Sequence, residues 1–249
     1  MKAIYDDIGQ GYSAKRGTDP NIAQQLYKEL VGAKRILNIG AGTGSYEPSG
    51  HDLIAVEPSV AMIKQRDALA YPVKQASADA LPFENKYFSH TMTILSMHHW
   101  HNRAKAFEEI NRVTTDKFVA ITWFPNLADF WLTKDYFPEI LKIDSAIFPS
   151  LNEIELAFGT IETKPLLIPK DCIDGFLAAY WARPEAYLDA TVRASISTFS
   201  KISNLDSGLS QLAQDLKSGQ WLAKYGRLLS QDWLDVGYRI VTVDFSKKT

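Results

Sequence analysis

The chain has 249 residues, 46% of them hydrophobic, and a formal net charge of −2. This length and composition suit one domain with a full core. The near-neutral charge, without a long run of Lys or Arg, argues against nucleic acid as a partner. The N-terminus has no apolar signal region, and no stretch approaches the ~20 apolar residues of a membrane span. The single cysteine, Cys172, excludes an intrachain disulfide. We therefore expect a cytoplasmic protein without a membrane partner.

The first half of the chain alternates helix and strand patterns. A helix is expected at 20–31, where Asp19 can cap the first turn and apolar residues recur every fourth position. Strand patterns occupy five segments: 35–39, 53–56, 72–75, 88–95 and 118–123. Helical patterns lie between them at 59–66 and around Phe107, Ile110 and Val113. This alternation predicts a parallel sheet.

The second half has a different pattern. Residues 125–148 are aromatic and loosely periodic, and residues 172–232 have a helical pattern throughout. A capped helix at 151–159 and strands at 161–168 and 237–245 complete the chain. If these two strands pair, the segment between them is an insertion over the carboxyl ends of the strands, where open α/β sheets bind ligands. We therefore expect 125–148 and 172–232 to form a helical cap.

A glycine-rich turn follows the first strand in ILNIGAGTGSYEPSG. Gly40, Gly42 and Gly44 permit positive φ angles and let backbone amides approach a ligand. A tight turn without any ligand has the same glycine spacing, so this pattern alone is a weak signal.

Two carboxylates strengthen the prediction of a ligand. Glu57, at the end of the second strand in LIAVEPS, can accept both hydroxyls of a ribose. Asp79, just after the third strand, can accept a hydrogen bond from an adenine amine, with Leu81 and Phe83 as apolar walls. The order and spacing of these acids after the glycine turn predict a nucleoside-bearing cofactor.

The segments ILNIGAGTG, VEPS, SADALPF, ILSMHHW and FEEINRV together resemble the class I S-adenosylmethionine-dependent methyltransferases, particularly the small-molecule branch of the methyltransferase 11 type. The resemblance covers roughly residues 1–123. It implies one Rossmann-like α/β domain with a seven-stranded sheet, mostly parallel with an antiparallel last strand. Helices would cover both faces, and the helical cap would precede the last strand. S-adenosylmethionine would be the cofactor and S-adenosylhomocysteine its product.

The resemblance also implies roles for individual residues. The residues expected to line the methionine part of the cofactor are Gly40, Ala41 and Gly42. Glu57 and Pro58 are expected beside the ribose, and Asp79 and Ala80 beside the adenine. Ile94 and Leu95 are expected near the sulfonium.

In similar proteins an N-terminal segment covers the cofactor, and the resemblance implies this role for residues 1–19. The matching residues in YDDIGQGYSAKR are Tyr5, Tyr12 and Arg16. The planar guanidinium of Arg16 suits the cofactor carboxylate.

The turn departs from the family pattern because few residues separate Gly44 from Glu57, and Pro48 would break a helix there. We expect the usual first helix to be reduced to a turn. A second departure is TTDKF, which replaces the usual glycine pair before the fifth strand.

Two alternatives to a methyltransferase remain open. A nicotinamide dinucleotide would need G-x-G-x-x-G, but position 45 is Ser, and Pro48 curtails the helix that would face a pyrophosphate. A non-catalytic protein that binds S-adenosylmethionine is also compatible, because fold does not fix function.

The candidate bases are His98 and His99, which follow the fourth strand, with His99 slightly favoured. A base is needed only if the nucleophile must lose a proton, and HHW also serves packing and capping in similar proteins. No cysteine or carboxylate cluster accompanies His98, His99 and His101, so no metal site is expected.

The substrate is expected to be a small-molecule methyl acceptor with an O, N or C nucleophile. The candidate contacts, at the end of the fifth strand and in the cap, are Trp123, Phe124, Tyr180, Trp181 and Arg183. An Arg beside aromatic rings suits a planar or anionic molecule, although packing of the cap explains most of its aromatic residues equally well.

Overall fold

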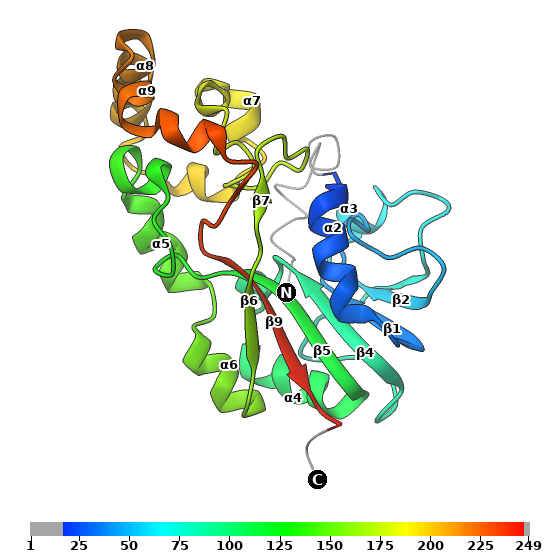
Figure 1. Cartoon of the computed structure of the whole chain (residues 1–249). Coiled ribbons are helices and arrows are strands. Elements are labelled where there is room, and N and C mark those ends of the chain that lie inside the picture. The colour runs from blue at the N-terminus through cyan, green and yellow to red at the C-terminus, as the bar shows by residue number, and fades with distance from the viewer. Residues whose placement is uncertain (1–16, 247–249) are drawn as a thin grey trace.

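Residues 17–246 are described by a computed structural model, in which one seven-stranded sheet has the order β3-β2-β1-β4-β5-β9-β6 (Figure 1). Its strands are β1 (Arg35–Ile39), β2 (Asp52–Val56), β3 (Val73–Lys74), β4 (Phe88–Ile94), β5 (Thr114–Trp123), β6 (Glu162–Pro165) and β9 (Tyr238–Asp244). The pairs from β3 through β5 are parallel, and β9 is antiparallel to both β5 and β6. The predicted sheet and its antiparallel last strand are confirmed.

Helices cover both faces of this sheet. On one face lies α2 (Pro20–Tyr27), which continues as a 3₁₀ turn over Lys28–Leu30. As expected, the Asp19 carboxylate caps it by accepting from the amides of Asn21 and Ile22. On the other face, α4 (Arg103–Val113) and α6 (Leu151–Phe158) bury their apolar sides in a second core cluster. Two cores, one on each face, hold the sheet in a layered α/β fold.

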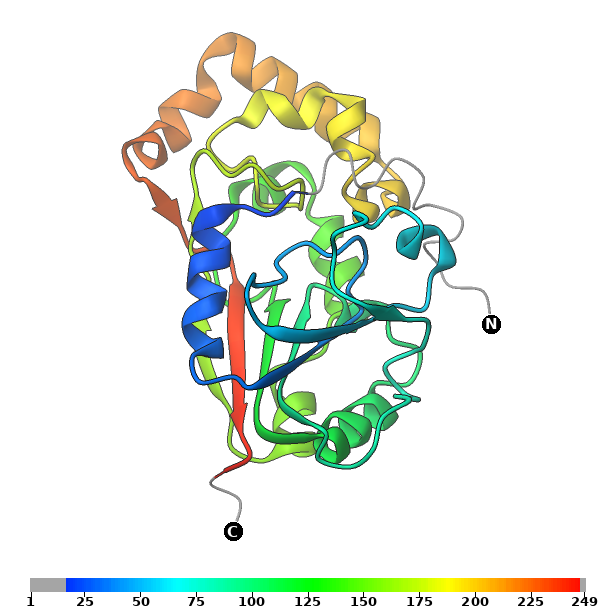
Figure 2. The same cartoon turned by 90° about the vertical axis from the view of Figure 1, so that its right-hand side faces the viewer.

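The cap lies beyond the carboxyl ends of the parallel strands (Figure 2). Its elements are a π-helical turn (Leu132–Tyr136), α5 (Glu139–Ile147), α7 (Ala190–Arg193), α8 (Leu205–Ser218), α9 (Gln220–Tyr225) and 3₁₀ turns over Pro184–Leu188, Ser197–Lys201 and Gly226–Ser230. A two-stranded ribbon of β7 (Ile168–Pro169) and β8 (Trp233–Leu234) joins it to the sheet. The predicted cap before the last strand is confirmed.

Two predicted helices differ from the structure. Residues 170–183 form successive turns, so the expectation of helix throughout 172–232 was wrong. The segment from Phe176 to Ala179 is buried along its whole length, which removes the two-faced pattern that a surface helix needs. The helix expected at 59–66 is a single turn, α3 (Val60–Ile63), capped by Ser59.

The glycine turn is followed by further turns and by no helix, as expected from Pro48. A buried ion pair supports it: Arg66 Nη2 lies 2.8 Å from Glu47 Oε2, with the two side chains 4% and 5% exposed. Arg66 also donates to the carbonyl of Gly42, and Asn38 donates to Glu47. Charge-assisted hydrogen bonds thus hold the turn where the family uses a helix.

Removing the charge of Glu47 should therefore destabilise the whole domain. We expect Glu47→Gln to lower the free energy of unfolding by about 3 kcal/mol, because Arg66 is left buried without its counter-ion. Urea denaturation measures this loss. The exposed pair of Lys105 and Glu108 supplies the control, since Glu108→Gln should cost less than about 1 kcal/mol. Equal losses in the two variants would contradict a supporting role for the buried pair.

Candidate active site

The glycine turn bends sharply at the ends of β1 and β2. The amides of Gly40 and Ala41 both donate to the carbonyl of Val56, at 2.9 and 3.0 Å. Gly40 has a φ of 66°, and a Cβ added there would lie 2.2 Å from the Oγ of Ser96. Gly42 also has a positive φ, of 54°. The turn requires glycine at 40 for both space and conformation.

The carboxylate of Glu57 is fixed beside this turn. Its Oε2 accepts from the amide of Gly42 at 2.9 Å, and its Oε1 accepts from the amide of Ser59 at 2.8 Å. Pro58 lies between these contacts, and its carbonyl accepts from Gln75. The side chain of Glu57 is buried. Backbone geometry therefore orients this acid at the end of β2, where a ribose would need its acceptor.

Hydroxyl groups tie the end of β4 to the end of β1. Thr93 Oγ1 donates to the carbonyl of Ile39 at 2.9 Å and lies 2.8 Å from Ser96 Oγ, which also accepts from Trp100. Leu95 has a φ of 49°, and its amide donates to Ile121 on β5. This conformation turns the chain after Ile94. The sequence did not reveal the role of Ser96, although its close approach is the reason why position 40 is glycine.

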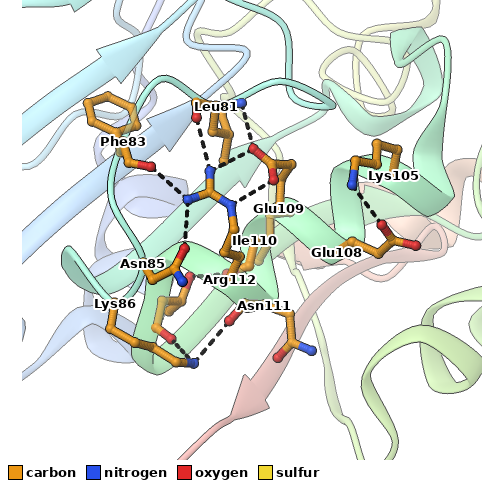
Figure 3. A network of polar contacts seen from close by, with 11 residues as sticks. Leu81, Phe83, Asn85, Lys86, Lys105, Glu108, Glu109, Ile110, Asn111 and Arg112 are labelled. Carbon is orange, nitrogen blue, oxygen red and sulfur yellow. Dashed lines mark hydrogen bonds and ion pairs between the residues drawn. The ribbon is translucent and has the colours of Figure 1, made fainter.

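The loop that carries Asp79 and Ala80 is held from α4 (Figure 3). Glu109 accepts from the amide of Leu81 at 2.8 Å, and Arg112 donates to the carbonyls of Leu81 and Phe83. The two α4 side chains also pair with each other at 2.7 Å, which lowers the pKa of Glu109. Asp79 itself accepts from the hydroxyl of Ser77. The loop is therefore set by two residues of FEEINRV that the sequence analysis did not assign.

The two candidate bases lie in a 3₁₀ turn, Met97–His99, directly after β4. The ring of His98 stacks on Phe148 with centroids 4.2 Å apart, and the ring of His99 lies 3.8 Å from that of His98. Both histidines are half-buried. Phe148 directly follows α5, so an element of the cap contacts the turn that carries the histidines.

Three of the residues expected to touch substrate pack in the protein interior. Trp123 and Trp181 are 1% and 0% exposed, and their indole N–H groups donate to the carbonyls of Val236 and Ile168. Phe124 is buried in the core on the side of α4. These three rings are packed in the core, and an aromatic residue can serve packing and ligand binding with the same chemistry. Their contact with the substrate stays a prediction.

Tyr180 and Arg183 remain half-buried in the cap. The guanidinium of Arg183 lies 4.9 Å from the ring of Tyr180, and its Nη2 donates to the carbonyls of Cys172 and Ala179. Within residues 17–246 no carboxylate pairs with Arg183, and its Nε is buried without a hydrogen-bond partner. This residue therefore retains the capacity to meet an anionic group.

A further acid, Asp144 on α5, was not singled out from the sequence. It is 2% exposed, and its Oδ1 accepts from the hydroxyl of Thr198 at 2.8 Å. Burial raises its pKa to about 6, although this hydrogen bond and the charge of Lys201 lower it. The signal was present in ILKIDSAIF, where Asp144 stands midway between Ile140 and Phe148 in a spacing of four.

The predicted contacts Tyr12 and Arg16, together with Tyr5, lie outside the residues that the structure describes. Within the described part, no group of three or more His, Cys, Asp or Glu residues is placed to hold a metal ion. No helix in residues 17–246 has the length and apolar character needed to cross a bilayer.

Comparison with known proteins places this geometry in a family. Residues 37–117 match the model of a methyltransferase domain. A solved protein of Anabaena variabilis, whose name is "putative methyltransferase from antibiotic biosynthesis pathway", is 34% identical and has a TM-score of 0.82. The match covers 92% of this chain and 98% of that one. The chain belongs to the class I S-adenosylmethionine-dependent methyltransferases.

Two other proteins are more distantly similar to this methyltransferase. A solved methyltransferase of Thermotoga maritima is 13% identical with a TM-score of 0.57, over 98% of this chain and 96% of that one, and shares the fold. An uncharacterized protein of Methanocaldococcus jannaschii is 28% identical over 140 residues, 54% of this chain. That match spans about half of the relative, 56% of its length.

The described residues of the methyltransferase fit S-adenosylmethionine, the cofactor of its family. Gly42 has a positive φ of 54° and no Cβ, so a ligand can approach its backbone without a side chain in the way. The fixed carboxylate of Glu57 offers acceptor oxygens beside that turn. The short turn without a long helix also suits a zwitterionic methionine tail better than a pyrophosphate, for which a helix N-terminus is the stronger partner.

The support of the Asp79 loop by α4 yields a prediction. Arg112→Gln should raise the dissociation constant of S-adenosylhomocysteine at least about fivefold, since loss of these hydrogen bonds frees the loop at a cost near 1 kcal/mol. Calorimetric titration measures the constant. Lys105→Gln, on the exposed side of the same helix, is the control and should bind as the wild type does. Wild-type affinity in Arg112→Gln would show that the loop keeps its shape without α4.

The raised pKa of Asp144 yields a second prediction. The folded chain holds a proton at Asp144 more tightly than the unfolded chain, so this acid costs stability above pH 6 and costs nothing below about pH 4. Asp144→Asn should therefore be more stable than the wild type by about 2 kcal/mol at pH 8, and the difference should vanish as the pH falls to about 4. Urea unfolding across this range tests it. A difference that does not change with pH would contradict the assignment.

Proposed function

We propose that this methyltransferase moves a methyl group from S-adenosylmethionine to an O, N or C nucleophile of a small molecule by in-line displacement. The observation that carries the proposal is the placement of the cap, which lies beyond the carboxyl ends of the parallel strands (Figure 2). Through Phe148 the cap contacts the His98–His99 turn directly after β4. A cap over the reacting edge suits an acceptor small enough to lie beneath it.

The cofactor supplies an electrophilic methyl group on a sulfonium. In this proposal Glu57 holds the ribose, while Asp79 and Ala80 flank the adenine. The methionine part lies against Gly40, Ala41 and Gly42, with Ile94 and Leu95 near the sulfonium. Arg16, outside the described residues, would pair with the carboxylate.

The chain contributes to the reaction mainly by positioning. An in-line displacement needs the nucleophile aligned with the methyl group and water kept away, and both can follow from a rigid cap. His99, or His98, would remove a proton only if the acceptor needs to lose one. Tyr180 and Arg183 are the cap residues that we propose for substrate contact, which favours a planar or anionic group in the acceptor.

A non-catalytic role is the alternative, because one fold supports several functions. We further propose that the protein acts in the cytoplasm on small molecules. The low net charge of the chain argues against nucleic acid as a partner.

Calorimetric titration with S-adenosylmethionine, S-adenosylhomocysteine and NAD tests the cofactor half of the proposal. We expect the first two to bind, with dissociation constants raised at least about tenfold in Glu57→Ala and in Asp79→Ala. Glu84→Ala, at an exposed acid of the same loop, should bind as the wild type does. Binding of NAD alone, or no effect of either variant, would overturn the assigned site.

Turnover separates the enzyme from the non-catalytic alternative. S-adenosylhomocysteine formation is followed with a library of small alcohols, amines and acidic aromatic compounds as acceptors. With an accepted compound, Arg183→Met should raise KM more than it lowers kcat if the residue binds the acceptor in both ground and transition states. Cofactor binding without any turnover across the library would favour the non-catalytic role.

A further inference from the structure

The acid Asp144 occupies an apolar position on α5. Ile140, Asp144 and Phe148 follow one another at intervals of four residues, which places them on one side of the helix. Ile140 is 0% exposed and Asp144 is 2% exposed, whereas the intervening Lys142 is exposed. A carboxyl group therefore stands where the pattern of an amphipathic helix places a leucine.

No positively charged side chain among the described residues pairs with the carboxylate of Asp144. Within the described residues the only hydrogen bond to its carboxylate comes from the neutral hydroxyl of Thr198, and the carboxylate forms no ion pair. Lys201, on the same 3₁₀ turn as Thr198, is exposed and acts on Asp144 only through space. A buried carboxylate without a cation or several donors carries a large desolvation cost.

The other buried aspartates of this region show what structural acids look like in the chain. Asp19 accepts from the amides of Asn21, Ile22 and Ile173. Asp174 accepts from the hydroxyl of Tyr46 and the amide of Gly175. Both are 2% exposed, like Asp144, but each has two or more donors. Asp144 is as buried as these two structural aspartates, but its carboxylate accepts fewer hydrogen bonds than theirs do.

The position of Asp144 directs it to the proposed acceptor side of the site. Phe148 lies one helical turn further along α5, and its ring stacks on His98 directly after β4. The same ring meets Trp123, at the end of β5, edge-on at 6.0 Å. Asp144 thus lies one helical turn before a residue that contacts the ends of the two central strands, and its carboxylate contacts Thr198 within the cap.

We propose that Asp144 binds a protonated amino group of the methyl acceptor, with the ring of Phe148 as its aromatic neighbour. A carboxylate and an aromatic face together recognise an ammonium group. The amino group serves recognition, and the nucleophile that takes the methyl group is a different atom of the acceptor. This inference rests on the proposed methyl transfer to a small molecule, and it explains why the chain keeps an acid that costs stability.

Thermal unfolding in saturating S-adenosylhomocysteine tests the proposal with a matched pair of probes. Benzylammonium chloride is compared at pH 7.5 with benzyl alcohol in an equal concentration of KCl. We expect benzylammonium to raise the Tm of the wild type above the value in benzyl alcohol, because it binds the folded state. The difference should be lost in Asp144→Asn, which keeps an oxygen for Thr198 and removes the charge.

Asp215→Asn is the matched control. Asp215 is also a cap acid that accepts from a hydroxyl, that of Tyr136, but it belongs to a different helix, α8. This variant should keep the difference between the two probes. A wild type that responds equally to both, or an Asp144→Asn variant that keeps the difference, would overturn the proposal. Failure of S-adenosylhomocysteine itself to raise the Tm of the wild type would instead refute the proposed function.

Discussion

The carbonyl of Val56 accepts from two consecutive amides, those of Gly40 and Ala41, and the rest of the cofactor site depends on this contact. It folds the chain back at the end of β1 and brings Gly40 against Ser96, just after the neighbouring strand β4. The same bend presents the amide of Gly42 to Glu57, which follows Val56 directly. One carbonyl therefore fixes the relation between the turn and the acid, and a side chain at position 40 would prevent it.

The absence of a helix after this turn shifts the burden of support to side chains. A helix would hold the turn through its own backbone hydrogen bonds. Here the side chains of Arg66, Glu47 and Asn38 hold it through hydrogen bonds and an ion pair. Burying this ion pair costs desolvation free energy. It also fixes the geometry of the turn, because each N–H donor of a guanidinium has a fixed direction. The methionine tail of the cofactor carries both charges, so the loss of the helix dipole matters less than it would for a phosphate.

Much of the fold, together with the glycine turn and the place of Glu57 beside it, could be predicted because these features depend on local patterns. Apolar runs predicted the strands, Pro48 predicted the missing helix, and Glu57 stands next to its strand in sequence. The cap could not be predicted as well, since its contacts join distant segments. Trp123 and Trp181 are aromatic residues with buried N–H groups, and only the distant carbonyls of Val236 and Ile168 show that they pack in the core.

The cap therefore has to be interpreted through polar groups, and not through its aromatic rings. An aromatic side chain is stable both in a core and against a ligand, so its burial does not tell the two apart. A buried charge, in contrast, must be compensated by a nearby partner. Asp19 and Asp174 find that partner within the chain and so report only on folding. Asp144 and Arg183 have no oppositely charged partner among residues 17–246, and they carry opposite charges themselves. An acceptor that paired with both would carry a cationic and an anionic group, so under our proposals these two residues restrict the chemistry of the acceptor more than the fold does.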